Sequence, residues 1–285
     1  MRFGLAFASS IGTGQQSAIE ISVKAETAGF DSVWGGEHVI CPDDIESKYP
    51  YSEDGSVPMT SETDVPDPLI WLAYVGAAAP TLKLGTCILI VPQRNPLVLA
   101  KELATLDHLT GGRVELGIGV GWMREEFEAL GIPWERRGAR NDEYIAAMRA
   151  LWAGPHAEFH GEFVDFDPLW SWPKPVQPGG PKVLLGAQSK WAFDRVVDYC
   201  DGWMPIGLMG GIDEGVASLR AACERAGRDF DSLHNALFAA PADVDACRKL
   251  LDQGFSELGF ALPSADREKV LPLLDRYAEL ARKLR

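Results

Sequence analysis

A glutamate and a histidine stand side by side, as Glu37 and His38, where a β-strand predicted over 32–37 ends. Imidazole titrates near neutral pH, so a histidine can give a proton to a reacting group or take one from it. Taken alone, such a pair is as common on an ordinary surface as in an active site. Its place at the carboxyl end of a strand, where catalytic side chains gather in barrel folds, favours the catalytic interpretation.

A second candidate is the glycine-rich run GIGVGW at 117–122. A dinucleotide-binding loop needs glycine at its first, third and sixth positions, and here Trp122 takes the sixth. Two interpretations stay open. The glycines either turn a strand into the next helix, or they leave the backbone bare so that a planar ligand can approach it, with Trp122 as a wall.

Four small or polar residues connect a strand predicted over 182–186 with a helix predicted over 190–199: Gly186, Ala187, Gln188 and Ser189. Ser189 has the right type and place to cap that helix. The free N–H groups of a helix start also bind phosphate, and the two interpretations are compatible. Lys190 and Arg94 are the cations that would add positive charge near such a ligand.

These residues lie between elements that alternate along the chain. Apolar runs of strand length predict eight β-strands, each followed by at least one helix. Eight such units in ~250 residues or a little more are typical of a single (β/α)8 TIM barrel, whereas a doubly wound sheet has fewer strands and a dinucleotide fingerprint. We therefore expect one barrel domain over 1–285. Its predicted strands cover 3–8, 32–37, 84–90, 113–118, 182–186, 202–206, 233–239 and 257–261.

Two stretches interrupt this rhythm. The polar segment 39–66 is too long for a plain connection, which indicates either a lid over a site or partial disorder. The segment 155–181 is rich in prolines and aromatic residues, and we expect it to be irregular.

Composition excludes several classes of function. A net charge of −14 argues against nucleic acid or an anionic membrane as a partner. Five scattered cysteines without a CxxC pair indicate reduced thiols in a cytoplasmic protein, and no metal-ligand spacing is present, so we expect no metal. The chain enters a strand at once, which leaves no room for a signal peptide, and the longest apolar helix, over 69–79, is too short to span a bilayer. Hydrolase motifs such as GxSxG and HExxH are missing as well.

The run LGTCILIVPQRNPLVLAKELATLDHLTGGRVELGIGVGW at 84–122 closely resembles the third and fourth βα units of the bacterial luciferase-like family. Further similarity follows in AGFDSVWGGEH at 28–38, DPLIWLAYVGAAAPTLKLGT at 67–86, RRGARNDEYIAAMRALW at 136–152 and PKVLLGAQSKWAFDRVVDYCDGWMPIG at 181–207. The resemblance implies a (β/α)8 barrel that holds a flavin-like ring across its C-terminal mouth. One branch of the family uses FMN, and the other uses the deazaflavin coenzyme F-420.

The resemblance also implies roles for particular residues. Glu37-His38 looks like the acidic–histidine pair of the deazaflavin branch, which makes His38 the expected proton donor or acceptor near the reactive ring carbon. A non-proline cis peptide often backs the ring in this family, and by position it would join Cys87 to Ile88. Other expected contacts with the coenzyme come from Glu37, Ile90, Val120, Gly121, Gly186, Ala187, Gln188 and Ser189.

Two residues depart from the sugar-phosphate dehydrogenases of that branch, which carry a catalytic glutamate in place of Trp122 and an asparagine in place of Glu125. An apolar Trp122 wall suits a flat or apolar substrate better. We expect an oxidoreductase that moves a hydride between coenzyme F-420 and a small organic molecule. The alternatives are a monooxygenase that uses reduced FMN and a flavin-binding protein without turnover. The family also implies a possible homodimer.

Overall fold

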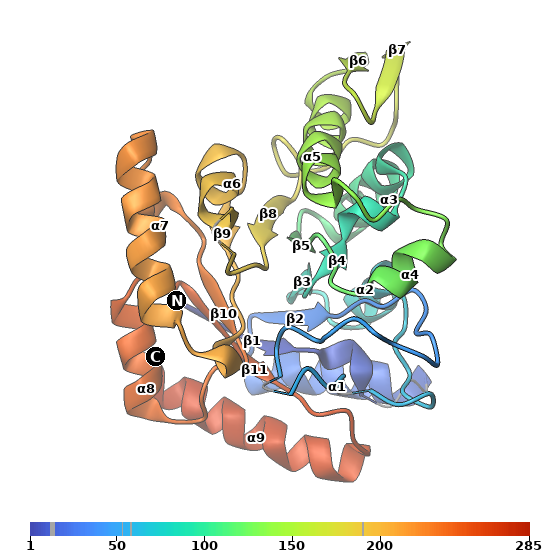
Figure 1. The fold of residues 1–285 in the computed structure, drawn as a ribbon. Helices are drawn as coiled ribbons and strands as arrows, with labels where there is room; N and C mark the ends of the chain where they lie inside the picture. Colours follow the sequence, from blue (N-terminus) through green and yellow to red (C-terminus); the bar gives the residue numbers. More distant parts are fainter. Residues whose placement is uncertain (12–14, 53, 58, 190) are drawn as a thin grey trace.

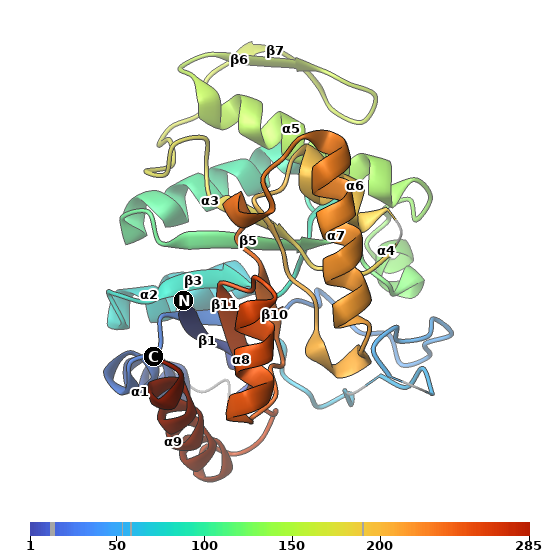
Figure 2. The same cartoon turned by 90° about the vertical axis from the view of Figure 1, so that its left-hand side faces the viewer.

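The computed structural model describes residues 1–285 apart from 12–14, 53, 58 and 190. Its centre is a parallel sheet that curls into a barrel, and the helices pack around the outside (Figure 1 and Figure 2). The strands of this sheet are β1 (Arg2–Ala6), β2 (Ser32–Gly35), β3 (Lys83–Thr86), β4 (Leu89–Ile90), β5 (Val114–Gly119), β8 (Lys182–Leu185), β9 (Gly202–Trp203), β10 (Ala236–Phe238) and β11 (Glu257–Ala261). The helices are α1 (Gln15–Ala28), α2 (Pro68–Ala78), α3 (Pro96–Thr110), α4 (Arg124–Ala129), α5 (Arg137–Ala153), α6 (Ala192–Asp198), α7 (Ile212–Ala226), α8 (Val244–Asp252) and α9 (Arg267–Leu284).

The strand order confirms the predicted fold. Neighbouring strands follow the path β10-β11-β1-β2-β3-β5-β8-β9, and all of these pairs are parallel. An isolated bridge between Ile206 and Phe238, with the Phe238 N–H donating to Pro205 O at 3.0 Å, joins the two ends of this path. The result is a nearly closed TIM barrel with eight strand positions.

One of these eight positions is shared by two short strands. The strand predicted over 84–90 is interrupted at Cys87 and Ile88, so that β3 pairs with β2 and β5 while β4 pairs with β5 alone. The peptide bond between these two residues is cis, as the resemblance implied. The Cys87 N–H still donates to Gly35 O at 2.7 Å, which keeps the interrupted strand attached to β2.

Local sequence signals define the ends of the helices. Asp67 caps α2 by accepting from the N–H groups of Leu69 and Ile70, and proline follows it at the first helical position. Asn95 and Pro96 begin α3 in the same way. Gly111 ends α3 at φ 69°, a left-handed conformation that a residue with a Cβ adopts only with strain.

The barrel interior is filled by side chains, and two glycines make room for the largest of them. A Cβ on Gly85 would lie 2.0 Å from the Trp34 ring, and one on Gly259 would lie 2.2 Å from Phe238. The two rings meet edge to face with their centroids 4.8 Å apart. The interior cluster consists of Ala6, Trp34, Cys87, Leu184, Met204, Ala236 and Phe238.

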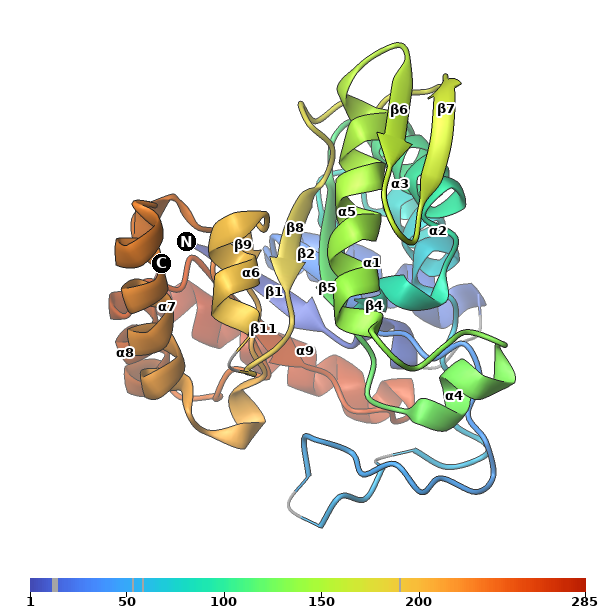
Figure 3. The same cartoon turned by 45° about the horizontal axis from the view of Figure 1, so that its top comes forward.

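The segment 155–181 is not irregular throughout, contrary to the prediction. It contains an antiparallel hairpin of β6 (Ala157–His160) and β7 (Asp165–Leu169) that lies against α5, outside the barrel (Figure 3). Pro168 and the exposed charges along this hairpin hide the period-two alternation that predicts a strand.

Among the described helices, none combines the length and the apolar character that crossing a bilayer requires.

Candidate active site

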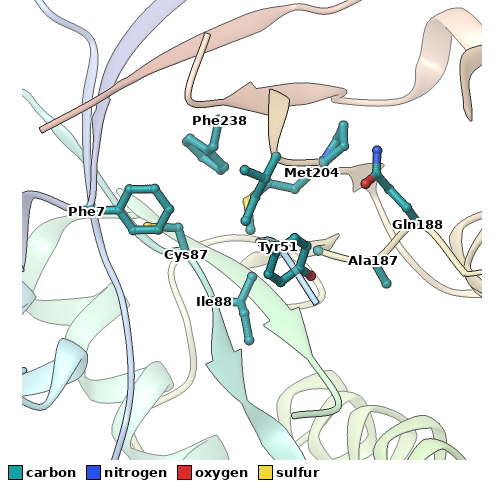
Figure 4. Close-up of a pocket in the computed structure, with 11 residues that line it drawn as sticks. Phe7, Tyr51, Cys87, Ile88, Ala187, Gln188, Met204 and Phe238 are labelled. Carbon is teal, nitrogen blue, oxygen red and sulfur yellow. The ribbon is translucent and has the colours of Figure 1, made fainter. Parts of the chain in front are cut away.

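A cavity lies at the carboxyl ends of the barrel strands, with an empty volume of about 400 Å³ that includes the open solvent at its mouth. This is the face at which TIM barrels hold their ligands. Figure 4 shows the rings of Phe7 and Phe238 on one side of it and the Gln188 amide on the other. Most of the lining is apolar, so the cavity suits a flat, largely apolar group.

Five of the residues predicted to bind the coenzyme line this cavity: Cys87, Ile88, Gly186, Ala187 and Gln188. They come from the interrupted third strand and from the loop after β8, two positions that lie on either side of β5. Trp203 Nε1 donates to Ala187 O at 2.8 Å and so fixes the loop after β8. Burial raises the pKa of the Cys87 thiol to about 12, which keeps this group protonated and makes it a wall instead of a nucleophile.

Six further residues line the cavity but were not predicted from the sequence: Phe7, Tyr51, Met204, Pro205, Ile206 and Phe238. All except Tyr51 lie at or just after the end of a barrel strand, so the rule that ligands sit at the carboxyl ends of strands could have found them. Phe7 has φ 58° and Ala239, next to Phe238, has φ 54°. Both are left-handed conformations that cost about 1–3 kcal/mol in a residue other than glycine and that cluster at functional sites.

The glycines of β5 serve packing and not ligand approach. A Cβ on Gly117 would lie 2.4 Å from Met204 Cε, and one on Gly119 would lie 2.5 Å from Ile88 Cδ1, so protein side chains already fill that space. Gly121, at φ 80°, does need its left-handed backbone, and its missing side chain leaves room for Phe127. Gly117 and Gly119 therefore lie within β5 and do not turn it into a helix, while the approach of a planar ligand to this run stays a prediction.

His38 and Trp122 lie beside the cavity and not in its lining. The two rings meet edge to face with their centroids 5.8 Å apart. Trp122 in turn contacts Tyr49 at 5.2 Å, and Tyr49 contacts Tyr51, which does line the cavity, at 5.4 Å. An unbroken row of aromatic side chains therefore connects the imidazole to the cavity wall.

A buried carboxylate holds the imidazole of His38. Its Nδ1 lies 3.3 Å from Glu126 Oε2, and the other oxygen of Glu126 accepts from the Val39 N–H at 2.7 Å. Burial acts to raise the pKa of Glu126, but hydrogen bonds, first of all that with His38, outweigh it and leave this pKa below its ordinary value. The structure thus places an ionised carboxylate against the predicted proton carrier, a pair that sequence reasoning missed because 88 residues separate its members.

Glu37 points elsewhere. Its carboxylate accepts from the Ile90 N–H at 2.6 Å and forms an ion pair with Arg94, which also donates to Asp67 at 2.6 Å. Burial raises the pKa of Glu37, whereas Arg94 and the Ile90 amide oppose that rise. Burial acts to lower the pKa of Arg94, but the carboxylates of Glu37 and Asp67 outweigh it and raise this pKa. The positive charge of Arg94 is therefore already neutralised, and the expectation that it would serve a phosphate is wrong.

The remaining predicted contacts are separate from the described cavity. Val120, Gly121 and Ile90 lie nearby without lining it, and Ser189 is exposed. Ser189 does not cap the next helix, because α6 begins at Ala192 with Trp191 as its N-cap. The prediction for Lys190 lies outside the described residues.

Helix α4 holds the long segment 39–66 against the site, and Figure 3 shows this segment extending below α4. Glu125 Oε1 accepts from the N–H groups of Glu46 and Ser47 at 2.9 Å each, and the Arg124 N–H donates to Ser47 Oγ at 3.1 Å. The departure from the family pattern at Glu125 thus has a structural use, since this carboxylate anchors the backbone of the segment that carries Tyr49 and Tyr51.

At the opposite end of the barrel, the described residues contain one buried group with metal-ligand spacing: Glu115, His234 and Glu257. The guanidinium of Arg2 stands among them, with Nη2 2.8 Å from Glu115 Oε2, 2.5 Å from Glu257 Oε2 and 2.6 Å from His234 Nε2. An arginine side chain thus takes the central position that an ion would need.

The sequence profile of luciferase-like monooxygenases matches residues 1–283. An uncharacterized protein of Mycobacterium tuberculosis is 34% identical over 279 residues, which cover 98% of each chain. An FMNH(2)-dependent dimethylsulfone monooxygenase of Pseudomonas putida is 33% identical over 179 residues, 61% of this chain and 49% of that protein.

Solved structures share the same fold at lower sequence identity. A monooxygenase of Streptomyces bottropensis superposes with a TM-score of 0.78 at 20% identity, covering 99% of both chains. An F420-dependent secondary alcohol dehydrogenase, solved with an F420-acetone adduct, also gives 0.78 at 17% identity and covers 100% of this chain and 99% of the other.

Proposed function

Because the chain belongs to the luciferase-like monooxygenase family, we propose that it is an oxidoreductase that transfers a hydride between coenzyme F-420 and a small organic substrate. The observation that carries this proposal is the imidazole of His38, held on the buried carboxylate of Glu126 beside an apolar cavity at the barrel mouth. A histidine that is fixed in this way can take the proton that accompanies a hydride when an alcohol becomes a carbonyl compound.

The donor set of the cavity fits the ring of a flavin or a deazaflavin. Phe7, Ile88, Met204 and Phe238 give it apolar walls, while the Gln188 amide and the Tyr51 hydroxyl are polar groups that can meet the edge of a heterocycle. When bound, coenzyme F-420 supplies the hydride donor or acceptor, and the protein supplies orientation and proton transfer.

The aromatic row next to His38 indicates the class of substrate. Trp122 and Tyr49 offer edges and faces but no formal charge, so a flat or apolar molecule gains contact there without losing charge hydration. We propose residues 39–66 as a lid that carries Tyr49 and Tyr51 over the bound substrate and excludes water. Shortening this segment should admit water and lower turnover.

A monooxygenase that uses reduced FMN is the second candidate. It is favoured by the dimethylsulfone monooxygenase of Pseudomonas putida, which shares 33% of its residues with this chain over the aligned stretch. The same apolar cavity and the same proton carrier would serve a flavin, so the two candidates differ in the coenzyme and not in the residues described above.

Titration of the purified, cofactor-free protein with coenzyme F-420 and with FMN separates the candidates. We expect F-420 to bind at least about tenfold more tightly, which corresponds to about 1.4 kcal/mol. Tighter binding of FMN, or no saturable binding of F-420, would overturn the first proposal.

Replacing His38 by alanine tests catalysis as distinct from storage of a coenzyme. The variant should keep its affinity for the coenzyme and lose about 10²–10⁴-fold in turnover, the typical contribution of a positioned acid or base. His108→Ala, at an exposed position on α3, is the matched control and should turn over normally. Full turnover in the His38 variant would remove the proposed role.

A further inference from the structure

We propose that Glu126 is the positioning residue of this site: it fixes His38 in the tautomer that keeps Nδ1 protonated and leaves Nε2 to exchange the proton with the substrate. The inference rests on the proposed function and adds to it a second residue, with a role that can be measured without substrate or coenzyme.

The contact geometry sets the tautomer. Oε2 of Glu126 lies 3.3 Å from Nδ1 of His38, and an ionised carboxylate can only accept hydrogen bonds. The nitrogen that faces it must therefore carry a hydrogen. Neutral imidazole carries one N–H, which leaves the other nitrogen, Nε2, with the free lone pair that a general base needs.

The carboxylate is itself held in place from the same stretch of chain. The side chain of Glu126 is 1% exposed, and its Oε1 accepts from the backbone N–H groups of Val39 at 2.7 Å and Ile40 at 3.4 Å. These two residues directly follow His38. The ring and its acceptor are therefore fixed relative to each other by one short segment clamped to α4, with the edge-to-face contact of Trp122 limiting rotation of the imidazole.

The surroundings of this carboxylate are unlike those of a simple packing contact. The amide of Gln93 is buried, and a hydrogen bond from this amide helps to lower the pKa of Glu126. A carboxylate that is buried, ionised and aimed at a histidine is typical of a group that orients a proton carrier.

A purely structural role for Glu126 is the competing explanation, because the same residue anchors the backbone at 39–40. Glu126→Gln separates the two roles. The amide oxygen can still accept from the Val39 N–H, whereas the amide N–H₂ then faces His38 Nδ1 and can only donate. The backbone anchor is retained, but the neutral imidazole is driven to the opposite tautomer.

Glu125→Gln is the matched control. Glu125 lies on the same helix and also anchors the segment 39–66, through the N–H groups of Glu46 and Ser47, but it does not touch His38. A loss of order in that segment would affect both variants, whereas a change of tautomer should affect only Glu126→Gln.

The experiment is nitrogen-15 NMR on cofactor-free protein labelled at its histidines, with the His38 signals assigned by their loss in His38→Ala. We expect the Nδ1–H form in the wild type and in Glu125→Gln, and the Nε2–H form in Glu126→Gln. Observation of the Nε2–H form in the wild type, or of an unchanged form in Glu126→Gln, would overturn the proposal.

Steady-state kinetics, measured with whichever of the two coenzymes binds, complete the test. Glu126→Gln should lower kcat about 10–100-fold and change KM less than about twofold, since residues that orient a histidine by hydrogen bonding typically contribute such factors. A fall confined to KM would also count against a positioning role. If neither coenzyme supports turnover while the tautomers behave as expected, the proposed function fails and the inference about Glu126 stands.

Discussion

Replacing Arg2 by methionine removes the cation from the buried cluster at the base of the barrel. In the wild type, Arg2 donates to both oxygens of Glu115, at 2.9 and 2.8 Å, and lies 2.5 Å from Glu257. Methionine keeps most of the apolar stem but no charge. Two carboxylates with 3% and 0% exposed side chains then face each other without their shared partner.

The expected loss follows from that burial. Removing one partner of a buried ion pair costs about 3–5 kcal/mol, because the other charge stays buried and uncompensated. The Arg2 side chain is 24% exposed, and water can enter the space it leaves, so we place the loss in free energy of unfolding at roughly 2–4 kcal/mol. Against a typical total of about 5–15 kcal/mol, this is a large fraction of the stability.

The loss should also depend on pH. Burial acts to raise the pKa of Glu257, but His234 and Arg2 outweigh it and hold this pKa below its ordinary value. A carboxyl with a lowered pKa in the folded state contributes stability above its unfolded pKa, near 4.3, and loses that contribution as the pH falls through the folded value. The variant lacks the Arg2 part of this contribution, so the difference between the two proteins should persist down to about pH 4 and shrink as the pH falls further.

Urea unfolding followed by tryptophan fluorescence at pH 7.5 and at about pH 3.5, on either side of the unfolded carboxyl pKa, gives the two free energies. Arg248→Met serves as the control, because Arg248 is 60% exposed and its ion pair with Asp245 spans 3.5 Å; it should change stability by less than about 0.5 kcal/mol. The reasoning is refuted if Arg2→Met equals the wild type within that margin at pH 7.5, or if the difference grows on acidification.

Three further predictions concern the cavity and the outer surface. Gly186→Ala would place a Cβ 2.5 Å from Ile88 Cγ2, so it should lower the free energy of unfolding in urea by about 1–3 kcal/mol and weaken coenzyme binding. Gly154→Ala is the control, because its Cβ would lie 3.7 Å from the nearest atom and should leave stability nearly unchanged. Equal losses of stability in the two variants would contradict this prediction. Tyr51→Ala removes a cavity wall and should raise the Kd of the coenzyme about tenfold or more in a fluorescence titration, whereas an unchanged Kd would show that the lid segment does not touch the ligand. Ile70 is 73% exposed on α2, so Ile70→Asp should shift an expected homodimer toward monomers in light scattering; a wild-type monomer, or an unaffected dimer, would remove that face as the interface.

The repeating units of the barrel could be predicted from the sequence because each strand is an apolar run and each helix has its own boundary residues. Strand lengths were overestimated, since hydrophobicity continues past the point where hydrogen bonding stops. The strand predicted over 202–206 keeps only β9, at Gly202–Trp203, although the chain remains buried through Pro205. Burial and backbone pairing are different properties, and a pattern of apolar residues reports only the first.

The candidate site was predicted where it depends on local sequence and missed where it depends on long-range pairing. The cavity residues at Cys87 and Ile88 follow from their place in one recognisable strand. By contrast, the pairing of Arg94 with Glu37 joins residues 57 positions apart, and that of His38 with Glu126 joins residues 88 apart. Tyr51 lies in a segment without any periodic pattern, so nothing in the sequence indicates that its ring enters the cavity.

The seam of the barrel has a consequence for which ligands the protein can accept. Every other neighbouring pair of strands shares at least two register positions, whereas β9 and β10 share none and their chain segments meet in the Ile206–Phe238 bridge. Hydrogen bonds from the His234 N–H to Asp201 O and from the Trp203 N–H to Asn235 Oδ1 also connect the two segments. Both bridging residues also form part of the cavity lining. The wall that they build rests on fewer paired strand positions than the wall at Cys87, which is fixed to Gly35. Substitutions at Ile206 and Phe238 should therefore reshape the cavity while leaving the strand pairs in the rest of the barrel unchanged.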